Sequence, residues 1–275
     1  MTDPLAVLDA WPVPNAAAAV LSADGIVTQR GDLTQRFALA SVTKPLAVLG
    51  ALVAVEEEAL GLDDPAITDV VDSATVRHLM SHASGLSPDR RNRAAEPGTR
   101  RIYSNIGIDI LGETVAAATG MPFPEYLRQA VFAPLGMSGT SVDGLPSRDG
   151  VASVADLARL IGELLRPTGW LHSTTLEAAT AVQFPGIRGV LPGYGAQDPN
   201  DWGLGFEIKG GKAPHWTGPA NSPATYGHFG QAGTMFWVDP VRRLGLVALT
   251  DRAFDVWAAA AWPELSDAVL AAYPN

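Results

Sequence analysis

The sequence predicts an α+β fold in which strands from both ends of the chain form an antiparallel sheet, with a helical lobe inserted between them. Two observations indicate this. Short apolar runs bounded by turn residues occur near both ends, whereas the middle of the chain has a helical pattern punctuated by proline and glycine. We expect residues 1–62 and 183–275 to form a discontinuous sheet lobe, residues 63–182 to form a helical lobe, and the active site to lie in the cleft between them.

The first strands are predicted on either side of an Asp24-Gly25 pair. Asp-Gly favours a tight hairpin turn, so residues 15–23 and 26–30 are expected to pair, although the alanines of the first run are good helix formers. Residues 36–40 would form a third extended piece that leads to Ser41.

A helix is predicted over residues 42–60, which are apolar on nearly every face at first. Such a helix is usually buried on all sides, so we expect it to lie between two layers. Further helical patterns occupy the middle of the chain, at residues 75–81, 106–119, 123–131, 154–165 and 174–182. Residues 87–101, rich in arginine and proline, are typical of an exposed loop.

Beyond Trp202 the pattern returns to strands. We expect strands at residues 203–209, 234–239 and 244–250, with a late group that begins at residues 226–234, and a final helix at residues 253–273. Residues 186–201, rich in glycine and proline, are expected to form a loop that covers the site as a lid.

Composition excludes several classes of function. The chain has 275 residues, a net charge of −10 and scattered basic residues, which argues against nucleic acid or an anionic membrane as the main partner. It has no cysteine, so disulfides and thiol catalysis are excluded. Residues 1–5 show neither the basic start nor the apolar run of an export signal, and no membrane span is predicted, so we expect a cytoplasmic protein. The oligomeric state is not predicted.

The first candidate motif is Ser41-Val42-Thr43-Lys44, where an extended run gives way to a helix. Residues three apart share one face of a helix, so the Lys44 amine can reach the Ser41 hydroxyl. A hydroxyl nucleophile needs a base in hydrogen-bond reach, and a helix start stabilises a developing negative charge. The alternative interpretation is a helix-capping serine beside a solvated lysine.

Tyr103-Ser104-Asn105 form the second candidate motif, at the end of a loop. A tyrosine can relay protons if a cation lowers its pKa, and Lys44 is the candidate cation. The Asn105 amide can donate to a carbonyl and accept from an ammonium. The alternative is a helix cap with a packed tyrosine.

The third candidate motif is Gly227-His228-Phe229-Gly230-Gln231. Glycines in a strand often mark a place where a ligand approaches the backbone, and His228 would line such a groove. The alternative is a β-bulge with a surface histidine.

These three motifs, in this order, resemble the serine beta-lactamase-related family, which includes class C beta-lactamases, D-alanyl-D-alanine carboxypeptidases and esterases of the same fold. The stretches at residues 78–86, 97–99, 203–206 and 233–240 are similar as well, and the resemblance extends from about residue 16 to residue 252. It implies a beta-lactamase/transpeptidase-like fold, with an antiparallel sheet flanked by helices.

The resemblance also implies a role for each site residue. Ser41 would be the acylated nucleophile and Lys44 its base, with Tyr103 sharing proton transfer. Asn105 would orient Lys44 and the substrate. The backbone N–H groups of Ser41 and Gln231, the latter after His228 and Gly230, would form the oxyanion hole. No cofactor or metal is implied.

One departure from the family pattern bears on the substrate. Many relatives that recognise beta-lactams have lysine where this chain has His228, and a neutral histidine binds a carboxylate weakly. The chain is also shorter than many relatives. We therefore expect an esterase or amidase that acts on a small ester, amide or lactam. D-alanyl-D-alanine carboxypeptidase or beta-lactamase activity is the second choice, and a catalytically silent ligand-binding protein is the rival from another class.

Three other functional interpretations have less support from the sequence. A nucleophile-elbow hydrolase needs Gly-x-Ser-x-Gly, which is absent. His78 and His82 are four residues apart, as metal ligands often are, but no glutamate follows His78 and no third ligand is evident. Arg252 could bind a substrate carboxylate, although a surface arginine is the simpler interpretation.

Overall fold

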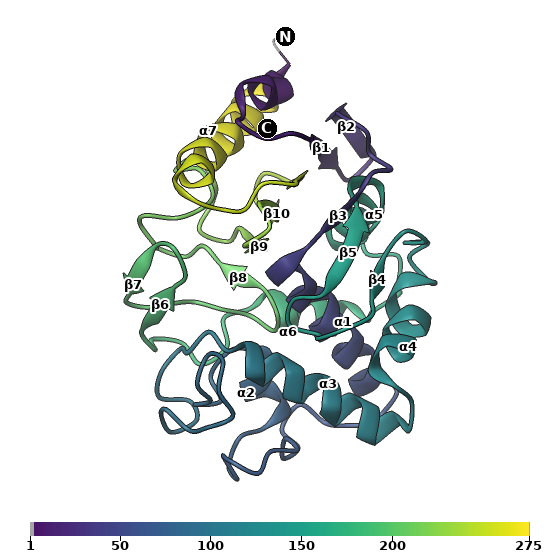
Figure 1. The fold of residues 1–275 in the computed structure, drawn as a ribbon, viewed down its shortest axis with the longest axis vertical. Helices are drawn as coiled ribbons and strands as arrows, with labels where there is room; N and C mark the ends of the chain where they lie inside the picture. Colours follow the sequence, from purple (N-terminus) through teal and green to yellow (C-terminus); the bar gives the residue numbers. More distant parts are fainter. Residues whose placement is uncertain (1–2, 275) are drawn as a thin grey trace.

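Strands from the two ends of the chain form one antiparallel sheet in the computed structural model, which describes residues 3–274. The order of its six strands is β2-β1-β11-β10-β9-β8, so that β1 pairs with β11 from the far end of the sequence. Figure 1 shows the ribbon, with five of these six strands labelled. The bounds of these strands are β1 Ala16–Ser22, β2 Gly25–Arg30, β8 Glu207–Ile208, β9 Tyr226–Gly230, β10 Thr234–Asp239 and β11 Leu244–Thr250. The predicted α+β class is confirmed.

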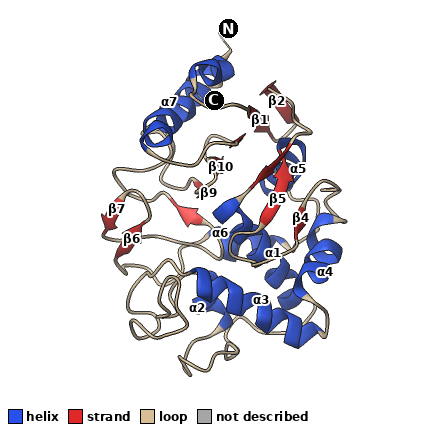
Figure 2. Cartoon of the chain, viewed as in Figure 1, coloured by secondary structure: helices blue, strands red, loops and turns tan. Residues whose placement is uncertain are grey.

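Ten helical segments lie outside this sheet in the part of the chain that the structure describes, and they are joined by long loops (Figure 2). Their bounds are η1 Pro4–Ala10, η2 Ala40–Val42, α1 Thr43–Glu56, α2 Val76–Met80, α3 Asn105–Thr119, α4 Phe123–Leu127, η3 Arg128–Phe132, α5 Val154–Leu165, α6 Ser173–Thr180 and α7 Val256–Ala272. Within residues 3–274, every helix is too short or not apolar enough to cross a bilayer. Met1 and Thr2, part of the segment expected to lack an export signal, lie outside the described residues.

Both faces of the sheet are covered, which explains why its strands are apolar without strict alternation. One face packs against α1 and α5, and the other packs against η1 and α7. In β1 the alternate residues Ala17 and Ala19 belong to the first core, whereas Ala18 and Val20 belong to the second. Alanine therefore suits this strand, because its small side chain lets the helical layers approach closely.

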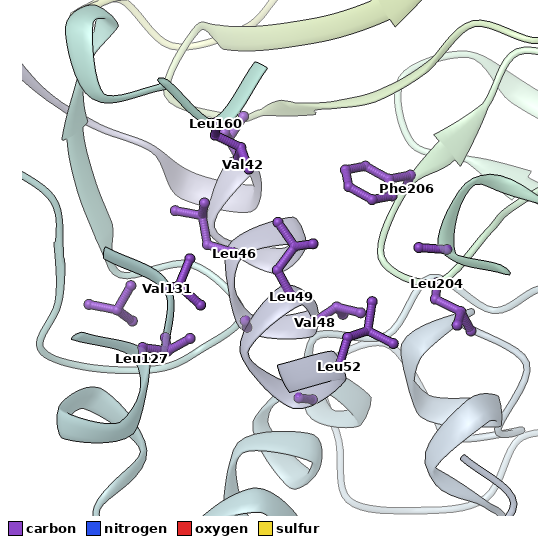
Figure 3. Packing of buried hydrophobic residues seen from close by; sticks show 14 of the residues in the cluster. Val42, Leu46, Val48, Leu49, Leu52, Leu127, Val131, Leu160, Leu204 and Phe206 are labelled. Carbon is purple, nitrogen blue, oxygen red and sulfur yellow. The ribbon is translucent and has the colours of Figure 1, made fainter. Parts of the chain in front are cut away.

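Helix α1 lies between the sheet and a second helical layer, as its apolar pattern predicts. Leu46 and Leu49 are fully buried, and the surrounding side chains come from the π-helical turn η3, from α4 and from the loop before β8 (Figure 3). Gly205 in that loop has a φ of +78°, and a Cβ there would lie 2.6 Å from Val48 Cβ. The strand predicted at residues 203–209 is consequently shortened to β8.

Several expectations need correction. The extended piece before Ser41, β3 (Arg36–Ala38), does not join the main sheet but pairs with β5 (Gly150–Ser153), which also pairs with β4 (Ser141–Val142). The extended piece expected before Ser41 is thus present as β3, whereas β4 and β5, of two and four residues, are too short to give a pattern in a region predicted as helical. The division into two lobes stays a prediction, although α5, expected in the helical lobe, packs against β1 and β11.

The loop predicted at residues 186–201 contains a small hairpin. Strands β6 (Gly189–Leu191) and β7 (Gly195–Gln197) form it, and a bridge between Arg101 and Gly189 joins it to the segment before Tyr103. This hairpin brings Leu191 and Pro192 to the wall of the site described next.

Candidate active site

Ser41 lies in the 3₁₀ turn η2, which leads directly into α1 at Thr43. The expected position at the start of the helix is therefore confirmed to within two residues. Ala40, the residue before it, has a φ of +45°, which is strained for a residue with a Cβ. The chain therefore turns sharply between β3 and α1, and Ser41 projects into a pocket at the turn.

Lys44 is completely buried, and its Nζ lies 3.0 Å from Ser41 Oγ. The same Nζ donates a hydrogen bond of 2.8 Å to the carbonyl oxygen of Ser147, in the loop before β5. Burial lowers the pKa of Lys44 to about 7, although the Asp109 carboxylate opposes this shift. A substantial fraction of the amine is thus neutral near pH 7, as a base must be.

The ring of Tyr103 lies next to the Lys44 amine. Lys44 Nζ lies 4.7 Å from the centre of this ring. Burial raises the pKa of Tyr103 above its usual value, and a hydrogen bond with Ser41 only partly opposes that effect. The expected lowering of this pKa by Lys44 is therefore wrong, because loss of solvent outweighs the effect of an amine that is only partly protonated near pH 7.

No hydrogen bond joins Asn105 to Lys44 among the residues that the structure describes. Its Nδ2 donates a hydrogen bond of 2.6 Å to Asp89 Oδ1, while the residue lines the same pocket as Ser41. The contact expected from Asn105 to the ammonium is made instead by Ser147 O. Ser147 is itself positioned by its backbone N–H, which donates to Asp109 Oδ1 at 3.1 Å.

The end of β9 lies directly against the turn that carries Ser41. A Cβ added at Gly230 would lie 2.2 Å from Leu39 O and 3.1 Å from Ser41 N, so only glycine fits there. Gln231 follows on the rim of the pocket, where its side-chain Nε2 donates to Phe254 O at 2.8 Å. The backbone at Gly230 therefore packs directly against the turn that carries the nucleophile.

All the candidate residues except Lys44 and Gly230 line one pocket of about 210 Å³. Its lining is Ser41, Tyr103, Asn105, Leu191, Pro192, Trp202, Glu207, His228, Phe229 and Gln231. A larger hollow of about 690 Å³ lies by α6 and β8 but is lined by none of the candidate catalytic residues. The smaller pocket is therefore the candidate active site.

His228 is buried in this site, at 2% exposure, and is not a surface residue. Its ring lies among Tyr103, Trp202 and Phe229, at centroid distances of 5.9, 5.5 and 6.3 Å. Burial, reinforced by Lys44, lowers the pKa of His228 to about 3. The side chain is neutral at pH 7, as the sequence suggested.

Two residues of the site, Ser147 and Glu207, are not among the candidates that the sequence predicts. Ser147 comes from a loop far from every motif, and nothing in its surroundings marks it. Glu207 has a visible signal, because it is a lone acidic residue in an otherwise apolar run, Leu204-Gly205-Phe206-Glu207-Ile208. A charge at such a position is expected to be paired, and Glu207 is paired with Lys212 and His215.

The remaining candidates have other roles. His82 Nδ1 accepts a hydrogen bond from Ser104 N at 3.2 Å, whereas His78 stacks on Phe184 at 4.5 Å. Arg252 donates from Nη1 to Pro12 O at 2.6 Å and does not line the pocket. These contacts support structural roles for the two histidines and for the arginine.

Comparison with protein families agrees with this geometry. Residues 9–270 match the profile of the family described as Beta-lactamase. A curated relative from Salmonella schwarzengrund, provisionally named a D-alanyl-D-alanine carboxypeptidase, is 28% identical over 203 residues, which cover 57% of this chain and 46% of the relative. The chain thus spans about half the length of the curated relatives that it matches.

Solved structures show the same fold. A beta-lactamase from Mycobacterium bovis is 52% identical, covers 99% of this chain and 100% of its own, and superposes with a TM-score of 0.96. A hydrolase with promiscuous acyltransferase activity is 19% identical with a TM-score of 0.80, over 96% of this chain and 95% of its own. The predicted beta-lactamase/transpeptidase-like fold is confirmed.

Proposed function

The chain belongs to the beta-lactamase family, and from that premise we propose that it is a serine hydrolase that forms a covalent acyl-enzyme on Ser41 and cleaves a small ester or amide. Members of this family are in general hydrolytic serine enzymes. The observation that carries the proposal is the 3.0 Å contact between Ser41 Oγ and the fully buried Lys44 Nζ, whose pKa is lowered to about 7 by burial. A hydroxyl next to a partly neutral amine is the arrangement that nucleophilic catalysis needs.

In the proposed first step, Ser41 Oγ attacks the carbonyl carbon of the substrate while Lys44 Nζ accepts the hydroxyl proton. The carbonyl oxygen becomes an oxyanion, which accepts hydrogen bonds from the backbone N–H groups of Ser41 and Gln231. Removing one such donor typically costs about 3–4 kcal/mol of transition-state stabilisation. The bond to the leaving group then breaks, leaving the acyl group on Ser41.

Tyr103 is proposed as the proton donor to the leaving group. Because burial raises the pKa of Tyr103, its phenol stays protonated, and the proton taken by Lys44 can replace the one that the phenol gives away. In the second step water attacks the acyl carbon and passes a proton to Lys44. The bond from that carbon to Ser41 Oγ then breaks, Oγ takes the proton back from Lys44, and the acid leaves. Asn105 is proposed to contact the substrate, since it lines the pocket.

Beta-lactamase or D-alanyl-D-alanine carboxypeptidase activity is the second candidate. The 52% identity to the M. bovis beta-lactamase favours it. The neutral His228 favours esterase or amidase activity, because it offers no charge to a substrate carboxylate.

Intact-mass spectrometry after incubation with a fluorophosphonate, and separately with a penicillin, tests the proposal. We expect one fluorophosphonate adduct on the wild type and on Ser138→Ala, a control at an exposed serine, and none on Ser41→Ala. A persistent penicillin adduct would favour the second candidate. The absence of any adduct on folded protein, together with no turnover of short esters, would favour a silent ligand-binding protein and overturn the mechanism.

A further inference from the structure

The pocket beside Ser41 contains an acceptor atom that the proposed acyl transfer does not use. His228 Nδ1 lies 2.7 Å from Phe229 O. A carbonyl oxygen only accepts hydrogen bonds, so Nδ1 must carry the ring proton, and Nε2 must present a lone pair. The pKa of about 3, which burial and Lys44 impose, keeps Nε2 in that state at neutral pH.

His228 Nε2 has no hydrogen-bond partner among the described residues, although it is shielded from solvent. Buried polar atoms are normally paired, and an exception needs an explanation. The His228 ring lies beside Tyr103 and Trp202, which line the same pocket. The simplest partner for Nε2 is therefore a donor group of a ligand in this pocket.

Glu207, another lining residue, adds a negative charge. It lies opposite Gly227 in the β8–β9 ladder, one residue from His228. Burial alone would favour its neutral form, but His215 and Lys212 lower the pKa of Glu207 to about 2, so it is ionised. Its Oε2 accepts hydrogen bonds from His215 Nε2 at 2.8 Å and from Trp216 Nε1 at 3.0 Å.

The cation that balances Glu207 is not available to a substrate. Lys212 has three N–H donors, and they go to Glu207 Oε1, to Asp201 O and to Ile208 O. His215 Nδ1 accepts from Thr217 N at 3.1 Å, which leaves Nε2 of the ring to donate to Glu207. No lysine or arginine is among the residues that line this pocket in the described part of the chain. The nearest cations are Lys44, which contacts Ser41, and Arg100 and Arg101, which line a neighbouring hollow on the Tyr103 side.

From these contacts we infer that His228 and Glu207 make an acceptor subsite, in which His228 Nε2 receives a hydrogen bond from a hydroxyl, amide N–H or ammonium group of the substrate and Glu207 repels a carboxylate. This inference rests on the proposed hydrolase function and specifies its substrate class. The substrate is an ester or amide with a donor group within reach of His228 and without a carboxylate there.

Two series of nitrophenyl and alkyl esters test the subsite, one varied in the acyl half and one in the alcohol half. Within each series the chain ends in methyl, hydroxyl, ammonium or carboxylate and is otherwise identical. In at least one series, we expect kcat/KM for the hydroxyl and ammonium esters to exceed that for the methyl ester by about tenfold or more, with the carboxylate ester slowest. A carboxylate ester that matches or exceeds the hydroxyl ester in both series would overturn the inference.

Variants of His228 give a readout that a general loss of activity does not affect. In His228→Leu, which has no acceptor, the ratio of kcat/KM for hydroxyl and methyl esters should fall to about one. In His228→Gln, which keeps an acceptor oxygen, much of the preference should remain. The control His172→Gln changes an exposed residue at the start of α6 and should leave the ratio as in the wild type. A preference that survives in His228→Leu would contradict the assignment.

A binding measurement keeps the subsite testable if the variants fail to fold or the hydrolase proposal fails. Ser41→Ala cannot be acylated, so its thermal shift with the short alcohol, amine and carboxylic acid of matched chain length reports binding alone. Stabilisation by the alcohol or amine but not by the acid supports the subsite whether or not the wild type turns over an ester. Equal stabilisation by all three, or by the acid only, would overturn it.

Discussion

Thr234 Oγ1 donates a hydrogen bond of 2.8 Å to the backbone carbonyl of Leu39, two residues before Ser41. This bond joins β10 to the turn that carries the nucleophile, and both ends of it are buried. The same carbonyl lies against Gly230. The position of Ser41 therefore depends on residues almost two hundred positions later in the chain.

Replacing Thr234 by valine tests this dependence. The side chain keeps its shape, but Leu39 O loses one of two donors and keeps only Val42 N at 3.1 Å. Loss of one such hydrogen bond typically costs about 0.5–1.5 kcal/mol. We expect Thr234→Val to lower the free energy of unfolding by that amount in urea titrations and to reduce kcat more than it changes KM. Thr28→Val, at a partly exposed position of β2, should change neither. An unchanged kcat in Thr234→Val would show that the bond does not position Ser41.

Gly230→Ala should lower stability and activity more than Thr234→Val does. The added Cβ would lie 2.2 Å from Leu39 O, so β9 or the Ser41 turn must move. We expect a loss of at least about 2 kcal/mol in stability and loss of fluorophosphonate labelling of Ser41. Gly162→Ala is the matched control, since its Cβ meets nothing within 4 Å in α5 and should stabilise the helix by about 1 kcal/mol. Normal labelling of Gly230→Ala would contradict the close packing.

The pH dependence of kcat/KM should follow the protonation state of the Lys44 amine. Only the neutral amine accepts the Ser41 proton, so activity should rise with pH through an apparent pKa of about 7. The Asp109 carboxylate raises the pKa of Lys44 and the Arg148 guanidinium lowers it. Asp109→Asn, which keeps an acceptor for Ser147 N, should move the acid limb to lower pH, and Arg148→Gln should move it higher, each by up to about one unit. Shifts in the same direction would exclude Lys44 as the titrating group.

Lys44 should also impose a pH dependence on stability. The unfolded chain holds this proton up to pH about 10.5, whereas the folded protein loses it near pH 7. Folding therefore releases a proton between these values, and stability should rise with pH across that window, by up to about 5 kcal/mol. Lys44→Met should lack this component and be inactive. Urea titrations from pH 6 to 10 check it, and parallel curves for the two proteins would refute it.

The buried Glu207–Lys212 pair should be strongly coupled. Both side chains are nearly inaccessible, at 2% and 1% exposure, so removing one partner leaves a buried charge and typically costs about 3–5 kcal/mol. We expect Glu207→Gln and Lys212→Met each to destabilise by about that much, and the double variant to regain most of it. The exposed pair Arg128–Glu125 is the control, where Arg128→Gln should cost less than about 1 kcal/mol. Additive losses in the double variant would mean that the pair is not coupled.

The parts of the site that sequence could predict are those governed by local spacing. The Ser41–Lys44 contact follows from residues three apart in a helical turn, and the close approach of Gly230 follows from a glycine in a strand. The Ser147 contact to Lys44 could not be predicted, because two residues far apart in sequence meet only through tertiary packing. The pKa of Tyr103 was predicted in the wrong direction for a related reason, since burial is a property of the whole fold and not of a motif.

The helices and strands also divide into those that local sequence predicts and those that depend on tertiary packing. Helix α1 and strands β10 and β11 are long and strongly patterned, and they were predicted within a few residues. Strand β8 was predicted too long, because the contact between Gly205 and Val48 is not local in sequence. Strands β4 and β5 were missed, because a strand of two to four residues carries too little pattern to outweigh the helical residues around it.

The pairing of β1 with β11 has a consequence for biosynthesis. On the ribosome, β1 and its hairpin partner β2 emerge long before the strand that completes their sheet, since Ala16 pairs with Thr250. Until β11 arrives, one edge of β1 has no backbone partner, and such an edge is prone to pair with other chains. The turn at Ser41 likewise lacks its contacts with Gly230 and Thr234 until β9 and β10 have been synthesised. A chain whose translation stops before β9 would thus contain the Ser-x-x-Lys motif without the strand that aligns it, and would be an aggregation risk without activity.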